Sequence, residues 1–446
     1  MMDFRKWTSV GLLRAGCLAS RLDIFGQWRW LQEANRWTPE QRAAWRLQRL
    51  GDILEFAWNE VPFYREFWGD HGVSFSRPKD LSDLERYPVL TKQLFRENSS
   101  RIRPAKVDAI RHMTKSTGGS TSVPVGYLLD LEQWSMMEAF HLWGWAQAGY
   151  EVGDPVGVIA GGSLVPKRMA WKSRLRSFAQ RRLFLYGVAM DQEMARDYHG
   201  RLTRYGAQFL YGYPSVMYLF AKNLHDLGLT LPGLKAVVTT AEMLLPQYRK
   251  GIEEWLGCPV FNDYGSNDGG TESYECRLHQ GFHYNDLQSI LETDHSGASG
   301  AEGALLITNL WNRSTPFIRY ENGDIAKLSN QRCACGAAFP LIASVQGRTT
   351  DIISFSNGRS LSGPALTLIF GKMAIDGWQI VQTGGMAMEV RLCGTGELVR
   401  QYGDEITTIL RHHLSEGVQL SIKQVATLTL TQGGKLKPVI NEFAVS

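Results

Sequence analysis

The spacing of apolar residues changes twice along the chain, and each change predicts a different kind of structure. Over residues 1–104 the spacing is helical, as in the segment that follows Thr38 and Pro39. Thr38 is the expected N-cap of that helix, and Pro39 suits its first position because the missing N–H would have no helical partner there. We therefore predict a mostly helical region over residues 1–104.

Short apolar runs alternate with helical stretches between about residue 105 and residue 345. The runs at 155–160, 234–240 and 304–309 have the length of buried strands, whereas 214–224 and 245–256 have helical spacing. Such an alternation is typical of α/β domains. We therefore expect an α/β core in this part of the chain.

After Gly347-Arg348 the pattern changes again. Segments 378–383 and 388–393 read as strands, and the chain then reaches Gly433-Gly434-Lys435. This predicts a small α+β domain at the C-terminal end. The expected fold class is thus multidomain α/β with α+β parts, and 446 residues at roughly 150 per domain give about three domains.

Composition narrows the functional classes. With 44% hydrophobic and 21% charged residues the chain is an ordinary globular protein, and its net charge of +4 is too small to imply nucleic-acid binding. No apolar run reaches the roughly 18 residues of a membrane helix, and Arg14 and Arg21 interrupt the N-terminal apolar stretch. We expect a cytoplasmic protein without a transmembrane segment.

Positive charge is concentrated between Lys167 and Arg182. This stretch contains seven basic residues and no acidic one: Lys167, Arg168, Lys172, Arg174, Arg176, Arg181 and Arg182. A solvated helix face explains the pattern, and so does a surface that meets an anionic ligand or a membrane. The sequence leaves both interpretations open.

Six cysteines are too few and too scattered for a disulfide framework in a chain of this length. Cys333-Ala-Cys335 is a close thiol pair, and Cys276 lies near His279 and His283. Three thiolates and one imidazole form a closed structural zinc set, which makes zinc one hypothesis and inert thiols the other. The spacing alone does not choose between the two histidines.

A loop rich in glycine and hydroxyl groups spans residues 115–124. Backbone N–H groups beside glycine can approach an anion closely, and serine and threonine hydroxyls add donors, so the loop suits phosphate oxygens. It lacks the Gly-x4-Gly-Lys-Ser/Thr pattern of a Walker A loop. Taken alone, a segment of this composition is more often an ordinary loop than a phosphate-binding one.

Four further segments follow this loop in a characteristic order. They are Tyr264-Gly265-Ser266-Asn267-Asp268, Arg319-Tyr320-Glu-Asn-Gly323-Asp324, Gly347-Arg348-Thr349-Thr350-Asp351 and Gly433-Gly434-Lys435. Together they resemble the adenylate-forming superfamily of acyl-CoA ligases. Four more motifs resemble its phenylacetate-CoA ligase family, especially the CapK-like members: Phe63-Tyr64, Tyr87-Pro-Val-Leu-Thr-Lys92, Gly281-Phe-His283 and Cys333-Ala-Cys335-Gly336. The resemblance spans essentially the whole chain.

The resemblance implies a large AMP-binding domain over residues 1–347 and a small mobile lid over 348–446, with Asp351 at the hinge. ATP, Mg²⁺ and coenzyme A would be bound. The residues implied for ATP are Ser116, Thr117, Gly118, Gly119, Ser120, Thr121, Ala241, Glu242, Tyr264, Gly265, Asp324 and Arg348. Asp268 would help to hold Mg²⁺, and Lys435 would be the catalytic lysine at the α-phosphate.

Three positions depart from the family pattern. Ser122 stands where the family has glycine, Thr350 replaces the first of two hinge acids, and Asp268 replaces a glutamate. Aspartate keeps the charge but reaches one methylene less, so the departure bears on Mg²⁺ placement.

The resemblance also implies a structural zinc site and suggests where the acid binds. Its zinc ligands would be Cys276, His283, Cys333 and Cys335. Aromatic residues could line the acid pocket, although aromatic side chains also build cores: Tyr127, Tyr211, Gly212 and Tyr213 are the candidates.

Three functional hypotheses follow. The first is acid activation to acyl-AMP followed by transfer to coenzyme A, with an aromatic or other small organic acid as substrate. The second keeps the adenylation but delivers the acyl group to an amine or hydroxyl in polysaccharide or secondary-metabolite synthesis. The third is a zinc-stapled binding protein with impaired catalysis. Oligomerisation and peripheral membrane contact through 167–182 are compatible with all three.

Overall fold

The structure is a computed structural model that describes most of the chain. The described residues are 4–116, 126–160, 164–165, 171–186, 190–294, 302–348, 352–355, 360–362, 370, 373, 375–414, 417–430 and 436–443. Their contacts form two compact units: unit 1 comprises Met1–Gly153 and Asp263–Val345, and unit 2 comprises Asp154–Asn262 and Gln346–Ser446. The domain boundary expected between residues 347 and 348 stays a prediction.

Unit 1 begins with the helical region that the sequence predicts. Its elements are α1 (Phe4–Ser20), α2 (Ile24–Ala34), α3 (Pro39–Glu60), α4 (Pro62–Asp70), η1 (Leu81–Arg86), α5 (Lys92–Asn98) and η2 (Val107–Ala109). The predicted N-cap of α3 is confirmed, because Thr38 Oγ1 accepts the Gln41 N–H at 3.3 Å. Gln41 Oε1 accepts the Thr38 N–H at 2.9 Å in return, which completes a capping box.

The rest of unit 1 is largely strands. A hairpin of β1 (His112–Ser116) and β2 (Gly126–Asp130) leads into α6 (Leu131–Gln147). Seven strands follow in the spatial order β10 (Ser289–Asp294), β11 (Gly303–Asn309), β12 (Tyr320–Leu328), β13 (Leu341–Arg348), β9 (Phe282–Tyr284), β8 (Thr271–Glu275) and β7 (Val260–Ser266). β11 confirms the strand predicted at 304–309.

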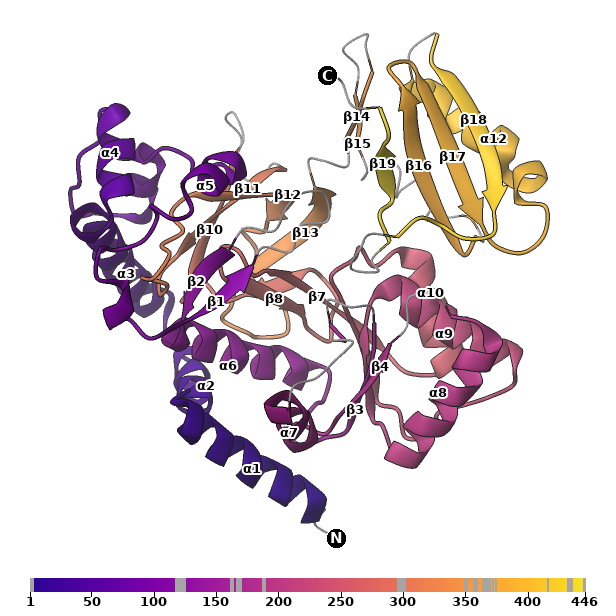
Figure 1. Ribbon diagram of the computed structural model, residues 1–446, viewed down its shortest axis with the longest axis horizontal. Helices are drawn as coiled ribbons and strands as arrows, with labels where there is room; N and C mark the ends of the chain where they lie inside the picture. The colour runs from indigo at the N-terminus through magenta and orange to yellow at the C-terminus, as the bar shows by residue number, and fades with distance from the viewer. Residues whose placement is uncertain are drawn as a thin grey trace. The chain divides into compact units, whose positions relative to one another are not determined.

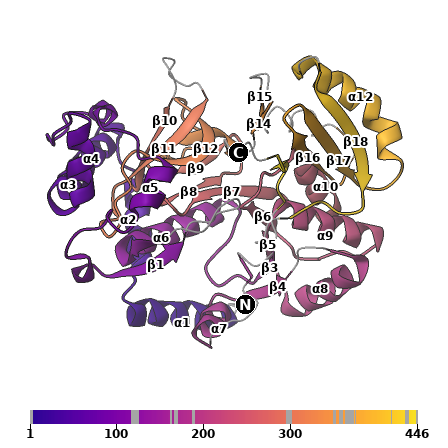
Figure 2. The same cartoon turned by 45° about the horizontal axis from the view of Figure 1, so that its top comes forward.

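Helix α6 packs directly on β8 (Figure 2). Gly144 permits this close approach, because a Cβ at that position would lie 2.1 Å from the Tyr274 ring. Trp143 and Trp145 on α6 are 7% and 1% exposed and belong to the core.

The N-terminal helices are fixed to the later part of unit 1. Tyr64 on α4 donates its hydroxyl hydrogen to the Pro316 carbonyl at 2.7 Å. Arg42 on α3 forms a buried ion pair with Asp286. Leu90 accepts the backbone N–H of Glu321 at 3.0 Å. Region 1–104 is therefore an integral part of unit 1.

Unit 2 contains a parallel sheet covered by helices (Figure 1). Its strands lie in the order β6 (Ala236–Thr240), β5 (Phe209–Gly212), β3 (Val156–Ala160) and β4 (Arg182–Tyr186). The connecting helices are α7 (Trp171–Ala179), α8 (Gln192–Tyr205), α9 (Pro214–Asp226) and α10 (Pro246–Leu256). The strands predicted at 155–160 and 234–240 and the two predicted helices are confirmed.

The C-terminal part of unit 2 is the small α+β fold that the sequence predicts. β18 (Gln419–Val425), β17 (Ala387–Cys393), β16 (Gly377–Gly384) and β19 (Val439–Asn441) form one sheet in that order, and α12 (Leu398–His413) packs on it (Figure 1). A short pair, β14 (Ile352–Ser354) and β15 (Ser360–Ser362), precedes them. Among the described residues, no helix combines the length and apolar character that a membrane crossing requires.

Candidate functional site

Asp324 is held in a fixed orientation in unit 1. The Tyr264 hydroxyl donates to Asp324 Oδ2 at 2.7 Å, and the Asn322 amide donates to the same oxygen at 2.9 Å. The Asp324 N–H in turn donates to Asn322 Oδ1 at 3.0 Å. Burial and the nearby Asp324 carboxylate raise the pKa of Tyr264 well above its usual range, so the hydroxyl remains a donor.

Asp268 has partners from two other segments. Lys92 Nζ lies 3.3 Å from Asp268 Oδ2, and the Tyr320 hydroxyl donates to the same oxygen at 3.0 Å. Lys92 also donates to the Asn322 carbonyl at 3.4 Å, which links the two aspartates. We call this group the carboxylate cluster, and its members are Lys92, Tyr264, Asp268, Tyr320, Asn322 and Asp324.

Sequence reasoning missed three members of this cluster. Lys92 and Tyr320 occur inside segments that carry the family resemblance, but neither received a role, and Asn322 was not considered. Thr91 caps α5 and places Lys92 at the first position of the helix, but this local signal does not indicate that Lys92 meets Asp268.

The β1–β2 hairpin carries two of the predicted residues. Ser116 is the exposed last residue of β1, and Tyr127 on β2 is 1% exposed. The Tyr127 hydroxyl donates to the Asn267 carbonyl at 2.8 Å, so this tyrosine supports the segment between Tyr264 and Asp268. Its predicted place in the acid pocket stays a prediction.

Glu272 and its partners form a second polar group that the sequence analysis did not identify. Glu272 pairs directly with Gly265 across β7 and β8. The Tyr274 hydroxyl donates to Glu272 Oε2 at 2.9 Å and lies 3.0 Å from His141 Nδ1. Burial raises the pKa of Glu272 to about 8, and the charge of Glu138 adds to the increase. This carboxyl is therefore mostly protonated at neutral pH.

Unit 2 brings Glu242 next to the segment that follows Lys435. Glu242 Oε2 accepts the Ser215 hydroxyl hydrogen at 2.7 Å, and Glu242 Oε1 accepts the Leu436 N–H at 2.6 Å. Ala241, before it, has a φ of +69°, a conformation that side-chain-bearing residues rarely adopt. Such strain is typical of a functional segment.

The predicted acid-pocket residues of unit 2 lie at the end of β5. Gly212 allows close contact between strands, because a Cβ there would lie 1.9 Å from the Ile159 carbonyl oxygen. Tyr213 is fully buried, whereas Tyr211 is partly exposed. No contact in the structure tests their role toward an acid.

Several predicted residues lie outside the described residues: Thr117, Gly118, Gly119, Ser120, Thr121, Asp351 and Lys435. Arg348 ends β13, but its side chain lies outside the description. The roles assigned to these residues stay predictions.

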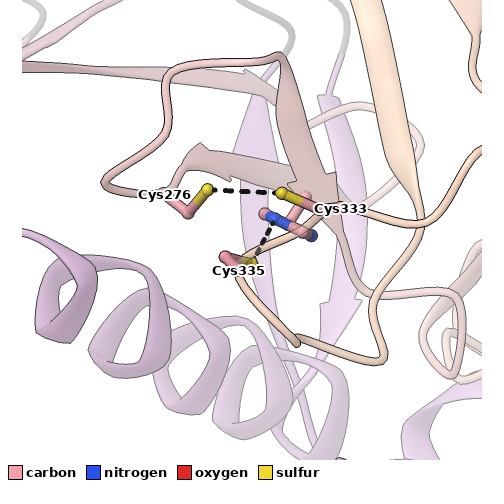
Figure 3. A group of neighbouring side chains, drawn as sticks. Cys276, Cys333 and Cys335 are labelled. Carbon is pink, nitrogen blue, oxygen red and sulfur yellow. Dashed lines mark hydrogen bonds between the residues drawn. The ribbon is translucent and has the colours of Figure 1, made fainter.

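Four metal-ligand residues converge in unit 1, and they are the set that the resemblance implies. The ligand atoms of Cys276, His283, Cys333 and Cys335 all lie within 4.8 Å of one another. Cys276 Sγ is 3.7 Å from Cys333 Sγ, and Cys335 Sγ is 3.3 Å from His283 Nε2 (Figure 3). We call this group the thiol–imidazole cluster.

The second histidine belongs elsewhere. His279 Nδ1 lies 3.0 Å from Glu275 Oε2, outside the cluster. His283 Nδ1 lies 2.7 Å from the Phe339 carbonyl, an arrangement that directs Nε2 toward the cysteines. Three sulfur atoms and one imidazole nitrogen are a donor set that fits tetrahedral Zn²⁺.

No family model matches the chain. Among curated proteins, Protein CapK of Staphylococcus aureus is 25% identical over 292 residues, which cover 64% of this chain and 62% of CapK. A phenylacetate-coenzyme A ligase of Thermus thermophilus is 25% identical over 328 residues, which cover 70% of this chain and 72% of that protein. The chain therefore matches less than two thirds of the length of CapK and somewhat more of the ligase.

Solved structures show the same likeness over more of the chain. A crystal structure of 2-hydroxyisobutyryl-CoA ligase in complex with 2-HIB-AMP has a TM-score of 0.72 at 21% identity, covering 91% of this chain and 90% of that one. The anthranilate CoA ligase AuaEII in complex with anthranoyl-AMP has a TM-score of 0.51 at 12% identity, covering 72% and 65%. The resemblance and the fold class expected from the sequence are confirmed, and the chain has the fold of the acyl-CoA ligases of the adenylate-forming superfamily.

Proposed function

We propose that this chain activates a small organic acid with ATP and transfers the acyl group to coenzyme A. A carboxylate oxygen of the acid attacks the α-phosphorus of ATP, the bond to the leaving pyrophosphate breaks, and acyl-AMP forms. The thiol sulfur of coenzyme A then attacks the acyl carbon and AMP leaves. The observation that carries the proposal is the carboxylate cluster, which orients two aspartates in a chain with the ligase fold.

Asp324 is suited to bind the ribose of ATP. A carboxylate has about four lone-pair sites, so Asp324 can accept hydrogen bonds from the ribose hydroxyls in addition to those that Tyr264 and Asn322 donate to Oδ2. Tyr264 and Asn322 hold Oδ2 at 2.7 and 2.9 Å, which fixes the plane of the group before the nucleotide arrives. The Asp324 carboxylate therefore loses its rotational freedom when the chain folds, and it loses little further conformational entropy when the nucleotide binds.

Asp268 is suited to help hold Mg²⁺ on the phosphates. It is 8% exposed, and carboxylate oxygen is a ligand that this hard cation prefers. Bound Mg²⁺ would offset the negative charge that repels the incoming carboxylate. Lys92, 3.3 Å from Asp268, adds positive charge and fixes the carboxylate.

Lys435 would supply positive charge at the α-phosphate. We assign the chain around this lysine, residues 348–446, to a mobile lid that is hinged at Asp351.

The thiol–imidazole cluster would hold a structural zinc ion. Cys276 follows β8 and Cys333 precedes β13, so the ion would join two distant segments of unit 1. Protein side chains would fill all four coordination positions of the zinc ion, so no position would be left for a reacting water. Because its substrates are ATP and coenzyme A, we place the enzyme in the cytoplasm.

One relative favours a second function. The match to Protein CapK extends over 292 residues, and this relative, unlike the others, is not named as a coenzyme A ligase. The alternative keeps the adenylation step but delivers the acyl group to an amine or hydroxyl acceptor. Both functions share the first half-reaction.

Exchange of labelled pyrophosphate into ATP, run over a panel of organic acids, tests the shared step. We expect acid-dependent exchange, and Lys435→Ala should lower it by roughly 100-fold or more because it removes charge from the transition state. Lys437→Ala, two residues further on, is the matched control and should retain exchange. Folded protein that shows no exchange with any acid would support an impaired binding protein instead.

A second assay separates the acceptors. Coenzyme A is added to the exchange mixture in one arm and candidate amines or sugars in the other, and products are identified by mass spectrometry. Thioester formation supports the ligase. Amide or ester formation without a thioester supports the alternative.

A further inference from the structure

Helix α7 in unit 2 presents an exposed apolar stripe. Trp171, Leu175 and Phe178 are 70%, 55% and 72% exposed. Their spacing of four and then three residues places them on one face of the helix. These are the most exposed large apolar side chains among the described residues of unit 2. An exposed apolar face of this kind is typical of an interaction surface.

Positive charge surrounds the stripe. Arg174 and Arg176 are exposed on α7 itself, and Arg181 and Arg182 follow it directly. No acidic residue occurs between Lys167 and Arg182. The charged residues of this stretch are therefore all basic.

The helix is anchored at its C-terminal end. Ala179, which ends α7, is 5% exposed, and β4 begins three residues later at Arg182. β4 pairs with β3 alone and forms an edge of the parallel sheet. α7 is thus held at a sheet edge, where its outer face can approach a broad flat partner.

From these observations we propose that α7 docks on the surface of an anionic lipid membrane. Tryptophan and phenylalanine bury their rings at the boundary between headgroups and acyl chains, while arginine remains among the phosphates. The exposed arginines of α7 match the negative charge of such a membrane, and each arginine or lysine near it adds about 1 kcal/mol. A protein partner would need a matching array of acids, so the charge pattern favours lipid. The docking does not rest on the proposed ligase function.

Vesicle flotation tests the docking. The full chain is mixed at low salt with vesicles of phosphatidylcholine alone or of phosphatidylcholine with about 30% phosphatidylserine. We expect binding only to the anionic vesicles, and we expect that binding to weaken at high salt. No binding of folded protein, or equal binding to neutral vesicles, would overturn the proposal.

Two sets of variants separate the apolar and charged contributions. Leu175→Ser with Phe178→Ser should lower the vesicle partition coefficient by at least about tenfold, since two apolar side chains no longer enter the membrane. Arg174→Gln with Arg176→Gln should lower it about tenfold or more on anionic vesicles. Val399→Ser removes an exposed apolar residue of α12 and is the control, which should bind like the original protein. Undiminished binding by both double variants would overturn the assignment to α7, and unchanged circular dichroism verifies their folding.

Discussion

The two clusters of unit 1 are completed in different ways. In the carboxylate cluster, each aspartate already has donors from the chain: Lys92 and Tyr320 for Asp268, and Tyr264 and Asn322 for Asp324. In the thiol–imidazole cluster, the ligand atoms face one another, and thiols are weak hydrogen-bond donors. The first cluster is therefore organised by folding alone, whereas the second would gain most of its stability from the zinc ion that we propose it binds. Changes in the first should affect activity, and changes in the second should affect folding.

The largest effect is expected from Cys333→Ser. Loss of one thiolate should lower bound zinc from about one per chain to near zero and reduce the unfolding free energy by roughly 3 kcal/mol or more. Elemental analysis and urea unfolding measure both quantities. Cys17→Ser is the control, since this cysteine lies on α1 outside the cluster. Unchanged zinc in Cys333→Ser would remove that residue from the ligand set.

The next effect is expected from Asp268→Asn. The amide keeps the shape but loses the charge that would hold Mg²⁺, so pyrophosphate exchange should fall about 100-fold, while zinc content and thermal stability change little. Tyr320→Phe removes a single hydrogen bond to Asp268 and should cost no more than about tenfold. If Asp268→Asn loses zinc together with activity, the two clusters do not act independently.

A smaller, pH-dependent effect is expected from Glu272→Gln. The folded pKa of Glu272 is about 8, above its usual 4.5, so the folded state holds a proton that the unfolded state has released. The contribution of Glu272 to the free energy of unfolding is therefore largest below about pH 4.5, and it is lost as the pH rises toward 8. Glutamine cannot ionise, so the variant should show a flatter stability profile between pH 5 and 8. Thermal unfolding of the original protein and of Glu272→Gln across that pH range measures the two stability profiles. Parallel profiles would contradict the raised pKa of Glu272.

The smallest effect is expected from Tyr264→Phe. The ring remains, but one of the two donors to Asp324 Oδ2 is lost, which costs about 1 kcal/mol in orientation. The KM for ATP should therefore rise about fivefold with kcat nearly unchanged. A large fall in kcat would show that Tyr264 contacts the reacting groups.

Much of the fold could be predicted because local signals agreed with the final structure. Thr38 and Pro39 begin α3, and the apolar runs at 155–160 and 234–240 are strands β3 and β6. The division into units could not be predicted in this way. Residues 263–345 join residues 1–153 through contacts such as Tyr64 with Pro316, which local patterns do not encode.

The sites were predictable to a different extent. The residues alone left His279 and His283 as alternatives for the metal site, and the family resemblance implied His283, which the structure brings together with the three cysteines. Partners such as Lys92 and Asn322 were missed because their role depends on distances across the sheet and not on residue type. Glu272 was missed for the same reason, since its raised pKa comes from burial beneath neighbouring residues.

Unit 1 is discontinuous in sequence, and this has a consequence for biosynthesis. A ribosome completes residues 1–153 first, yet the strands and zinc ligands that finish the unit come only with residues 263–345. At about 5 to 20 residues per second, the helical N-terminal region waits roughly 10 to 40 seconds for its partners. During that interval the indoles of Trp30 and Trp45 lack Trp311, whose ring centroid lies about 6 Å from theirs in the finished protein. We therefore expect the nascent chain to expose this apolar surface until translation has passed residue 345.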